Sequence, residues 1–246
     1  MLISDLKDVS LEEGEFVGGK AAMLGALMRW GFQVPAGFVI RVGAFKSDQL
    51  DTELTRAVAK LQTDGPTLFA VRSSATIEDS AAASCAGMHD TYLNVEALRI
   101  EEFARQCLDS LLSRTAVAYR MGAGLIDAQM AVIVQRMINA KIGGVMMTCN
   151  PMNGDNETVV IEAVPGSCAA LVSGELTPDH YDVAKNGSCI TSYLACDDQL
   201  LSESQLDNLR VLGIDIARHC HRPQEIEWAI DHDGKLHVLQ SRPVVI

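Results

Sequence analysis

Two acids, an amide and an arginine near the end of the chain have the types and spacing of a site for a metal ion and a phosphate. Glu225 and Glu227 alternate with apolar residues, as in a half-buried strand, and Gln240 and Arg242 repeat that spacing. A four-residue turn at 231–234 would place all four side chains on one face of a hairpin. Carboxylate and amide oxygens suit a hard divalent cation, and a guanidinium can hold phosphoryl oxygens. The alternative is a solvated polar face.

A second candidate begins at Arg72, where an apolar strand is predicted to end. Ser73, Ser74 and Thr76 follow it. We expect their hydroxyl groups and backbone amides to surround an anion while the guanidinium binds two of its oxygens. The small residues at 81–84 suit a segment that moves over a bound ligand. The alternative is a hydroxyl-rich turn whose arginine pairs with an acid that follows it.

A third candidate is a glycine-rich helix start. Gly14, Gly19 and Lys20 have the spacing of a phosphate-binding P-loop, but Ala21 stands where that motif needs a hydroxyl for magnesium. We therefore do not predict a P-loop. Gly18, Gly19 and Lys20 could still offer backbone N–H groups and an ammonium to a phosphate. The alternative is an ordinary helix start.

Gln135 and Met137 end the apolar strand predicted at 130–137. An amide and an exposed backbone could bind the edge of adenine while the methionine packs on its face. The alternative is that Met137 belongs to an ordinary core. His219 and His221 lack metal-ligand spacing, and the chain contains no Gly-x-Ser-x-Gly motif of a serine hydrolase.

The elements that must position these residues fall into two halves. Periodicity and turn residues predict helices at 18–30, 45–61, 96–119 and 202–219, and strands at 34–40, 67–72, 130–137, 143–148, 158–163 and 181–184, before the closing hairpin. A polar loop is expected from Ser73 to Gly87. Glycines near position 123 mark the predicted boundary between lobes at 1–125 and 126–246.

Composition sets further limits. The 246 residues are 48% hydrophobic, which suits a folded chain with a substantial core. A net charge of −12 argues against nonspecific binding to nucleic acid. No apolar run approaches the roughly 20 residues of a membrane span, and the acidic N-terminus does not resemble a leader, so we expect a cytoplasmic protein. Seven cysteines without a Cys-x-x-Cys pair predict reduced thiols.

Taken together, several blocks resemble the nucleotide-binding domain of phosphoenolpyruvate synthase and pyruvate phosphate dikinase, which rifampin phosphotransferases share. They run in the family's order as GGKAAMLG, VPAGFVI, AVRSSATIEDS, AGMHDTYLNV, VIVQRM, GGVMMT, SGELTPDHY and EIEWAIDHDGKLHVLQSRPV. The resemblance implies an α+β, ATP-grasp fold in which two lobes clasp Mg-ATP. Matched to the family's motifs, Lys20 and Arg72 would hold the ATP phosphates, and the strand at Gln135 and Met137 would contact adenine.

The same resemblance assigns roles to the hairpin. Glu227 and Gln240 would bind magnesium, and Arg242 would stabilise the transferring group. Glu225 stands where the family usually has aspartate, next to the metal acid. We therefore expect Arg242, Arg72 and Glu225 to form the catalytic group, in which charge neutralisation and positioning perform the chemistry.

Relatives of this kind use ATP to phosphorylate or pyrophosphorylate a histidine on a swivelling domain. No Thr-x-His segment of such a domain follows the hairpin, so we expect a separate carrier protein or the remainder of a longer enzyme, and a small-molecule final acceptor. The family's Trp-Gly-Leu-Gly segment is replaced by residues 164–168, the segment between Phe38 and Arg72 is short, and the hairpin is one residue longer than usual.

Three functions follow from these observations. The first is a phosphotransferase subunit or domain that uses ATP and magnesium and acts on a carrier histidine. The second is direct phosphorylation or activation of a small molecule. The third is a nucleotide-binding module without catalysis, motivated by the altered segment at 164–168. The products formed from ATP distinguish these three.

Overall fold

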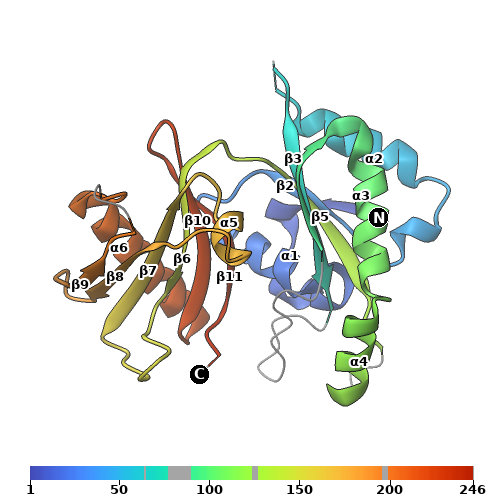
Figure 1. Cartoon of the computed structure of the whole chain (residues 1–246). Helices are drawn as coiled ribbons and strands as arrows, with labels where there is room; N and C mark the ends of the chain where they lie inside the picture. Colours follow the sequence, from blue (N-terminus) through green and yellow to red (C-terminus); the bar gives the residue numbers. More distant parts are fainter. Residues whose placement is uncertain (64, 77–89, 124–126, 196–198, 246) are drawn as a thin grey trace. The chain divides into compact units, whose positions relative to one another are not determined.

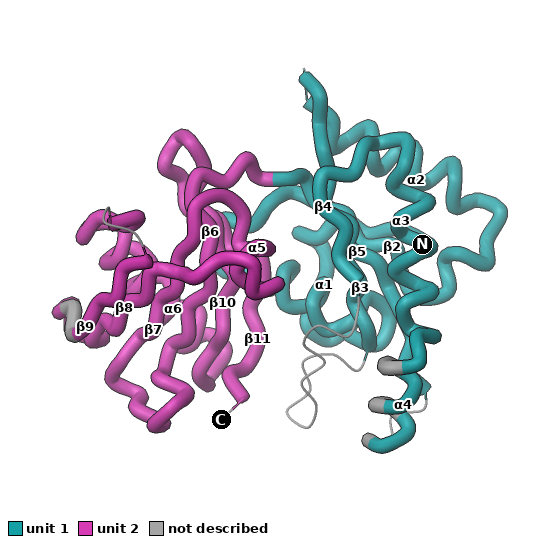
Figure 2. Tube along the Cα trace, viewed as in Figure 1, with its two compact units in different colours: residues 1–137 teal, residues 138–246 magenta. Residues whose placement is uncertain are grey.

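The computed structural model describes residues 1–63, 65–76, 90–123, 127–195 and 199–245. The chain divides into two compact units, residues 1–137 and 138–246 (Figure 2). Each unit contains an antiparallel sheet with helices, which confirms the predicted α+β class (Figure 1). The loop segment predicted to move at 81–84 lies outside the described residues. Within those residues, no helix is long and apolar enough to cross a membrane.

The first unit has a five-stranded sheet in the order β1-β2-β5-β3-β4. Its strands are β1 (Ile3–Asp5), β2 (Gly37–Ile40), β3 (Leu68–Ala75), β4 (Thr91–Glu96) and β5 (Met130–Arg136). The predicted lobe boundary near position 123 places β5 in the second lobe, but its backbone pairs with both β2 and β3 in the sheet of the first unit. Those partners are distant in the chain, so local periodicity could not reveal them. The sequence analysis also missed β1 and β4.

Two of the three helices predicted for this unit are each divided, whereas the third, predicted at 18–30, begins earlier, at Gly14. The helices are α1 (Gly14–Arg29), α2 (Leu50–Leu61), α3 (Ile100–Ser110) and α4 (Arg114–Ala123), with the short 3-10 helices η1 (Leu6–Asp8), η2 (Leu11–Glu13), η3 (Ala44–Lys46) and η4 (Ala97–Arg99). The single helices predicted at 45–61 and 96–119 are therefore wrong. Ser47 and Ser113 lie in the two breaks, and the Ser47 hydroxyl accepts a hydrogen bond from the Gln49 N–H. Serine favours such helix boundaries because its side chain competes for backbone groups.

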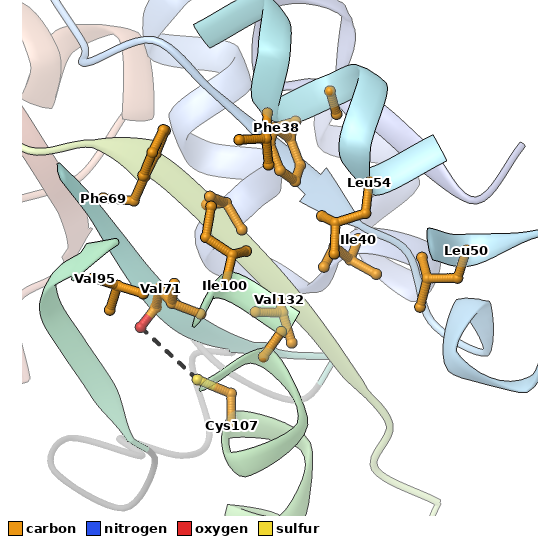
Figure 3. Close-up of a cluster of buried hydrophobic side chains, with 14 of the residues drawn as sticks. Phe38, Ile40, Leu50, Leu54, Phe69, Val71, Val95, Ile100, Cys107 and Val132 are labelled. Carbon is orange, nitrogen blue, oxygen red and sulfur yellow. Dashed lines mark hydrogen bonds between the residues drawn. The ribbon is translucent and has the colours of Figure 1, made fainter. Parts of the chain in front are cut away.

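The core of the first unit lies between one face of the sheet and helices α2 and α3 (Figure 3). Phe69 and Val71 of β3 point into it and belong to the same buried cluster as Leu54 of α2 and Ile100 of α3. Side chains alternate along a strand, so the even-numbered positions of β3 face the opposite way. Cys107 is also buried here, with its Sγ 3.8 Å from the Val71 carbonyl. Burial raises the pKa of this thiol to about 12, which keeps it protonated.

The second unit has a six-stranded sheet in the order β11-β10-β6-β7-β8-β9. Its strands are β6 (Ala140–Met147), β7 (Thr158–Pro165), β8 (Asp179–Ala184), β9 (Cys189–Tyr193), β10 (Gln224–Asp231) and β11 (Leu236–Pro243), and its helices are α5 (Ala169–Val172) and α6 (Glu203–Cys220). The predicted helix at 202–219 and the closing hairpin are confirmed, while β9 was missed. The described cysteines 107, 149, 168 and 220 are free thiols, as expected.

Helix α6 covers one face of this second sheet. Gly213 lies so close to β6 that a Cβ on it would come within 3.1 Å of the Met146 Sδ. The helix begins at Ser202, whose hydroxyl accepts the Gln205 N–H while the Gln205 side chain accepts the Ser202 N–H. This capping box satisfies two backbone donors that a helix start leaves without partners. The other face of the sheet carries the candidate metal residues.

Candidate functional site

The hairpin of β10 and β11 brings the four predicted hairpin residues together. Glu225 pairs directly with Arg242, and Glu227 pairs directly with Gln240. Directly opposed residues of an antiparallel pair point to the same side of the sheet. The register therefore confirms that all four side chains share one face.

The turn that produces this register differs from the predicted one. Ile230 pairs with Leu236, which leaves a five-residue connection in place of the four-residue turn. The register then shifts where Trp228 pairs with Val238, and Leu239 is the extra residue of a β-bulge. The longer connection and the bulge each add one residue, so the expected face pattern is preserved.

Arg242 and Glu225 form an ion pair on the shared face. Their side chains are 25% and 24% exposed, so both remain within reach of solvent. The guanidinium is thus oriented by a carboxylate of its own hairpin. A planar guanidinium held in this way can present further N–H groups to phosphoryl oxygens.

Glu227 and Gln240 fit a magnesium ion that is shared with a nucleotide. They offer one carboxylate and one amide oxygen from directly paired positions. Throughout the described part of the chain, no group of three or more His, Cys, Asp or Glu residues could hold a metal by itself. Magnesium usually takes one or two carboxylates and completes its shell with waters and substrate phosphates. The donor set therefore matches a metal-nucleotide complex better than an all-protein metal cage.

The polar face extends beyond the hairpin. Glu227 pairs with Val145 of β6, Val145 with Glu162 of β7, and Glu162 with His180 of β8. The His180 ring lies between two acids, with Nδ1 3.7 Å from Glu162 and Nε2 3.4 Å from Asp182. Sequence reasoning missed this row, because the alternating pattern of β7 and β8 does not reveal which strands become neighbours.

Residues 166–168 of the altered segment lie on the same face, after Val164 and Pro165 end β7. Gly143 and Val145 are two residues apart in β6, so both face the same side of the sheet. Because Val145 pairs with Glu227, this is also the side that carries the Glu227 side chain. A Cβ on Gly143 would come within 2.4 Å of the Cys168 nitrogen and 2.8 Å of the Gly166 carbonyl oxygen. The backbone of this segment therefore rests directly on the sheet, and a glycine at 143 permits that approach.

In the first unit, the fold brings four predicted residues to one region. Arg72 and Ser74 occupy even positions of β3, and Gln135 of β5 pairs with Ala70 of β3, so all three face away from the apolar cluster. Helix α1, which carries Lys20, packs against this face of β3 and β5. Arg72 is only 9% exposed. The elements that carry Lys20 and Arg72 thus pack against each other within the first unit.

The expected loop around an anion is wrong at its start. Ser73 and Ser74 are fully buried in β3, and their backbones pair with Val132 and Ala131. The Ser73 hydroxyl donates to the Asp90 carbonyl at 3.1 Å. Strand pairing has taken the backbone groups that we expected to surround a ligand.

The Ser74 hydroxyl accepts a hydrogen bond from the Ala21 N–H at 3.1 Å. Thr76 follows the end of β3, and its hydroxyl accepts the Gln129 N–H at 3.1 Å. All three hydroxyls of the serine and threonine group therefore have protein partners. Their direct contact with ATP stays a prediction.

Gln135 and Met137 are also held by the protein. The Gln135 side chain donates to the Pro35 carbonyl at 3.1 Å, and the residue is 3% exposed. The Met137 N–H donates to the Leu68 carbonyl at 2.9 Å, and its side chain is half-buried. Met137 thus has surface to offer a ring, while the Gln135 amide is already engaged. The adenine contact stays a prediction.

Thr76 lines a cavity of about 500 Å³ in the first unit. Glu15, Phe16, Asp127 and Gln129 also line it. Sequence reasoning did not select these residues, although Phe16 is an exposed aromatic side chain just before the glycines of α1. The cavity is assembled from segments far apart in the chain.

Comparison with known proteins identifies the family. The model of the pyruvate phosphate dikinase AMP/ATP-binding domain matches residues 46–199 and 191–246. A probable phosphoenolpyruvate synthase from Archaeoglobus fulgidus is 32% identical over 310 residues, covering 97% of this chain and 41% of the relative. A rifampicin phosphotransferase from a Streptomyces species is 33% identical over 313 residues, covering 99% of this chain and 36% of the relative. The chain thus spans less than half the length of these relatives.

Solved structures show more distant likenesses. D-alanyl-alanine synthetase A from Vibrio cholerae has a TM-score of 0.46 and 9% identity, covering 92% of this chain and 58% of that one. The ATP-grasp ligase PsnB has a TM-score of 0.42 and 11% identity, covering 92% of this chain and 50% of the PsnB chain. Likeness at this level carries no functional weight, so the assignment rests on the sequence matches. The family model covers most of the chain and the relatives span nearly all of it, and the chain therefore belongs to the pyruvate phosphate dikinase AMP/ATP-binding domain family.

Proposed function

We propose that this chain binds Mg-ATP and transfers a phosphoryl or pyrophosphoryl group to a histidine on a separate carrier domain or protein. One observation supports this proposal above all. Glu225 lies directly opposite Arg242, and Glu227 lies directly opposite Gln240, on one face of the hairpin. The family's AMP/ATP-binding domain and the two transferases among the relatives support it.

The residues matched to the family's motifs would contribute different chemistry to ATP binding. Lys20 and Arg72 would bind phosphate oxygens, while Glu227 and Gln240 would hold magnesium. When bound, the metal would neutralise charge on the β- and γ-phosphates. Local positive charge is needed because the chain has a net charge of −12.

Arg242 would act on the transferring group, with Glu225 orienting its guanidinium. In phosphoryl transfer, the terminal phosphorus–oxygen bond breaks as the acceptor nitrogen bonds to that phosphorus, and ADP leaves. In pyrophosphoryl transfer, the acceptor nitrogen bonds to the β-phosphorus as the bond from that phosphorus to the oxygen bridging it to the α-phosphate breaks, and AMP leaves with that oxygen. Preorganised donors lower such barriers because negative charge spreads over the oxygens in the transition state.

The first test replaces Arg242, the arginine proposed to act on the transferring group. Arg242→Ala should lower turnover by about 10²-fold or more while ATP affinity stays within roughly tenfold, because the contact strengthens in the transition state. Turnover is measured with labelled ATP and carrier candidates, and affinity by calorimetry. Arg218→Ala on the exposed surface of α6 is the matched control and should change neither. Unchanged turnover in Arg242→Ala would refute the assigned role.

The second test addresses the metal and the products. Glu227→Ala should weaken magnesium-dependent ATP binding, and equal metal titrations for variant and wild type would contradict the ligand assignment. Product analysis then separates the reactions, because AMP indicates pyrophosphoryl transfer and ADP indicates phosphoryl transfer. Labelling of a small molecule without a carrier would indicate direct kinase activity. ATP binding without AMP or ADP would indicate a noncatalytic module.

A further inference from the structure

Helix α1 is interrupted just before Lys20. Gly18 has φ 77° and ψ 161°, which is not helical, so the regular helix starts afresh after this residue. A helix start leaves backbone N–H groups without partners inside the helix. The turn that carries Lys20 therefore depends on groups outside α1 to satisfy and orient it.

Ser74 of β3 supplies that contact. Its hydroxyl accepts the Ala21 N–H at 3.1 Å, and the residue is fully buried. This bond does from a neighbouring strand what an N-cap side chain does from within the helix sequence. The helix start is therefore attached to the sheet at the residue that follows Lys20.

Gly18 packs on the same serine. A Cβ on Gly18 would come within 2.2 Å of the Ser74 carbonyl oxygen and 2.3 Å of its Oγ. The positive φ of Gly18 and this close approach both favour glycine. Ser74 thus meets α1 on both sides of Lys20, through Gly18 and through Ala21.

We propose that Ser74 is a positioning residue for the nucleotide, because its hydroxyl caps the turn that carries Lys20 and fixes that ammonium relative to Arg72. Arg72 lies two residues earlier in β3 and on the same face. One strand therefore carries the guanidinium and also the cap of the helix that carries the ammonium. In this proposal Ser74 acts through the helix, in place of the direct ATP contact expected from the sequence, and its role rests on the proposed function.

A double-mutant cycle on the full chain tests this route. Ser74→Ala should weaken Mg-ATP binding roughly tenfold, the effect of losing a typical cap, and Lys20→Met should weaken it further. If Ser74 acts through Lys20, adding Ser74→Ala to Lys20→Met should change affinity little, because the positioned group is already gone. Additive losses would show direct contact and overturn the proposal, as would unchanged affinity in Ser74→Ala.

Hydrogen exchange without nucleotide tests the cap independently of function. The Ala21 amide should exchange at least roughly tenfold faster in Ser74→Ala and in Gly18→Ala, with the fold checked by circular dichroism. Ser110→Ala is the matched control, because Ser110 is also buried in this unit but its hydroxyl donates within α3, to Cys107. It should alter neither Ala21 exchange nor ATP affinity.

The two measurements separate the possible failures. Unchanged exchange at Ala21 would overturn the cap even if the wild type binds Mg-ATP. If the wild type does not bind Mg-ATP, the proposed function fails and Ser74 has no role in binding, whereas faster exchange would still establish the cap.

Discussion

Arg242, Ser74 and Gln135 each have a protein partner. Arg242 pairs with Glu225, Ser74 accepts from Ala21, and Gln135 donates to Pro35. Such partners hold side chains in place before a ligand arrives, which lowers the ordering cost of binding. Residue type alone therefore does not separate a ligand-binding group from one that orients its neighbour.

Asp231 is a residue whose charge stabilises the hairpin turn. Its Oδ2 lies 2.8 Å from His237 Nε2, and its Oδ1 accepts the Lys235 and Asp233 N–H groups at 2.8 and 3.0 Å. The hydrogen bond to His237, followed by the bond from Lys235, lowers the pKa of Asp231 below its usual 3.8. A lowered carboxyl pKa stabilises the fold above the unfolded value, and this stabilisation is lost as pH falls through the folded value.

We expect Asp231→Asn to lower the free energy of unfolding at pH 7 by about 1 kcal/mol, because charge-assisted hydrogen bonds become neutral ones. The difference from wild type should shrink as pH falls below 3.8, where the unfolded carboxyl becomes protonated, and should be smallest below the lower pKa of the folded carboxyl. Urea unfolding at pH 7 and near pH 3 measures both. A difference that is constant with pH would show that the charge of Asp231 is not responsible.

The β10–β11 hairpin shows how an element can carry an additional residue without losing its chemistry. Leu239 is accommodated in a bulge between the pairs Trp228–Val238 and Glu227–Gln240. Gln240 therefore still lies opposite Glu227. An insertion absorbed by a bulge leaves the face pattern intact, whereas a register shift of one residue moves side chains to the other face.

Two single-residue deletions in β11 test this difference. Deleting Leu239 should remove the bulge, keep Gln240 opposite Glu227 and retain most turnover. Deleting Ser241 should move Arg242 opposite Ile226, on the face covered by α6, and lower turnover by about 10²-fold. Labelled-ATP assays measure turnover, and circular dichroism checks that both variants fold. Equal losses in the two variants would show that the bulge itself is required.

For the whole chain, the proposed function requires groups from both compact units. Residues 1–137 carry Lys20 and Arg72, whereas residues 138–246 carry Glu227 and Gln240. Each unit has its own sheet and buried side chains. Binding of Mg-ATP to the folded chain would therefore add to its stability.

Mg-ATP at about one hundred times its dissociation constant should raise the free energy of unfolding by about 2.7 kcal/mol, because it binds the folded state alone. Removing magnesium with EDTA should abolish most of this gain, since the carboxylate of Glu227 would then face phosphate without the metal. Thermal unfolding with ATP, with ATP and magnesium, and with magnesium alone measures the effect. A full shift with ATP and EDTA would contradict the magnesium role.

Several features were predictable from local patterns in the chain. Alternation in β10 and β11 indicated the shared face of Glu225, Glu227, Gln240 and Arg242, and apolar periodicity indicated helix α6. The ordered motif blocks indicated the family. These signals are local because side-chain direction depends on strand parity, and the apolar face of a helix repeats with each turn.

Other features depended on contacts between distant segments. The position of β5 between β2 and β3, the burial of Ser73 and the contact of Ser74 with Gly18 and Ala21 all arise where separate segments pack. A serine after an arginine has the same composition in a phosphate loop as in a buried strand. Backbone pairing and close packing decide between them, and these interactions form only when the chain folds.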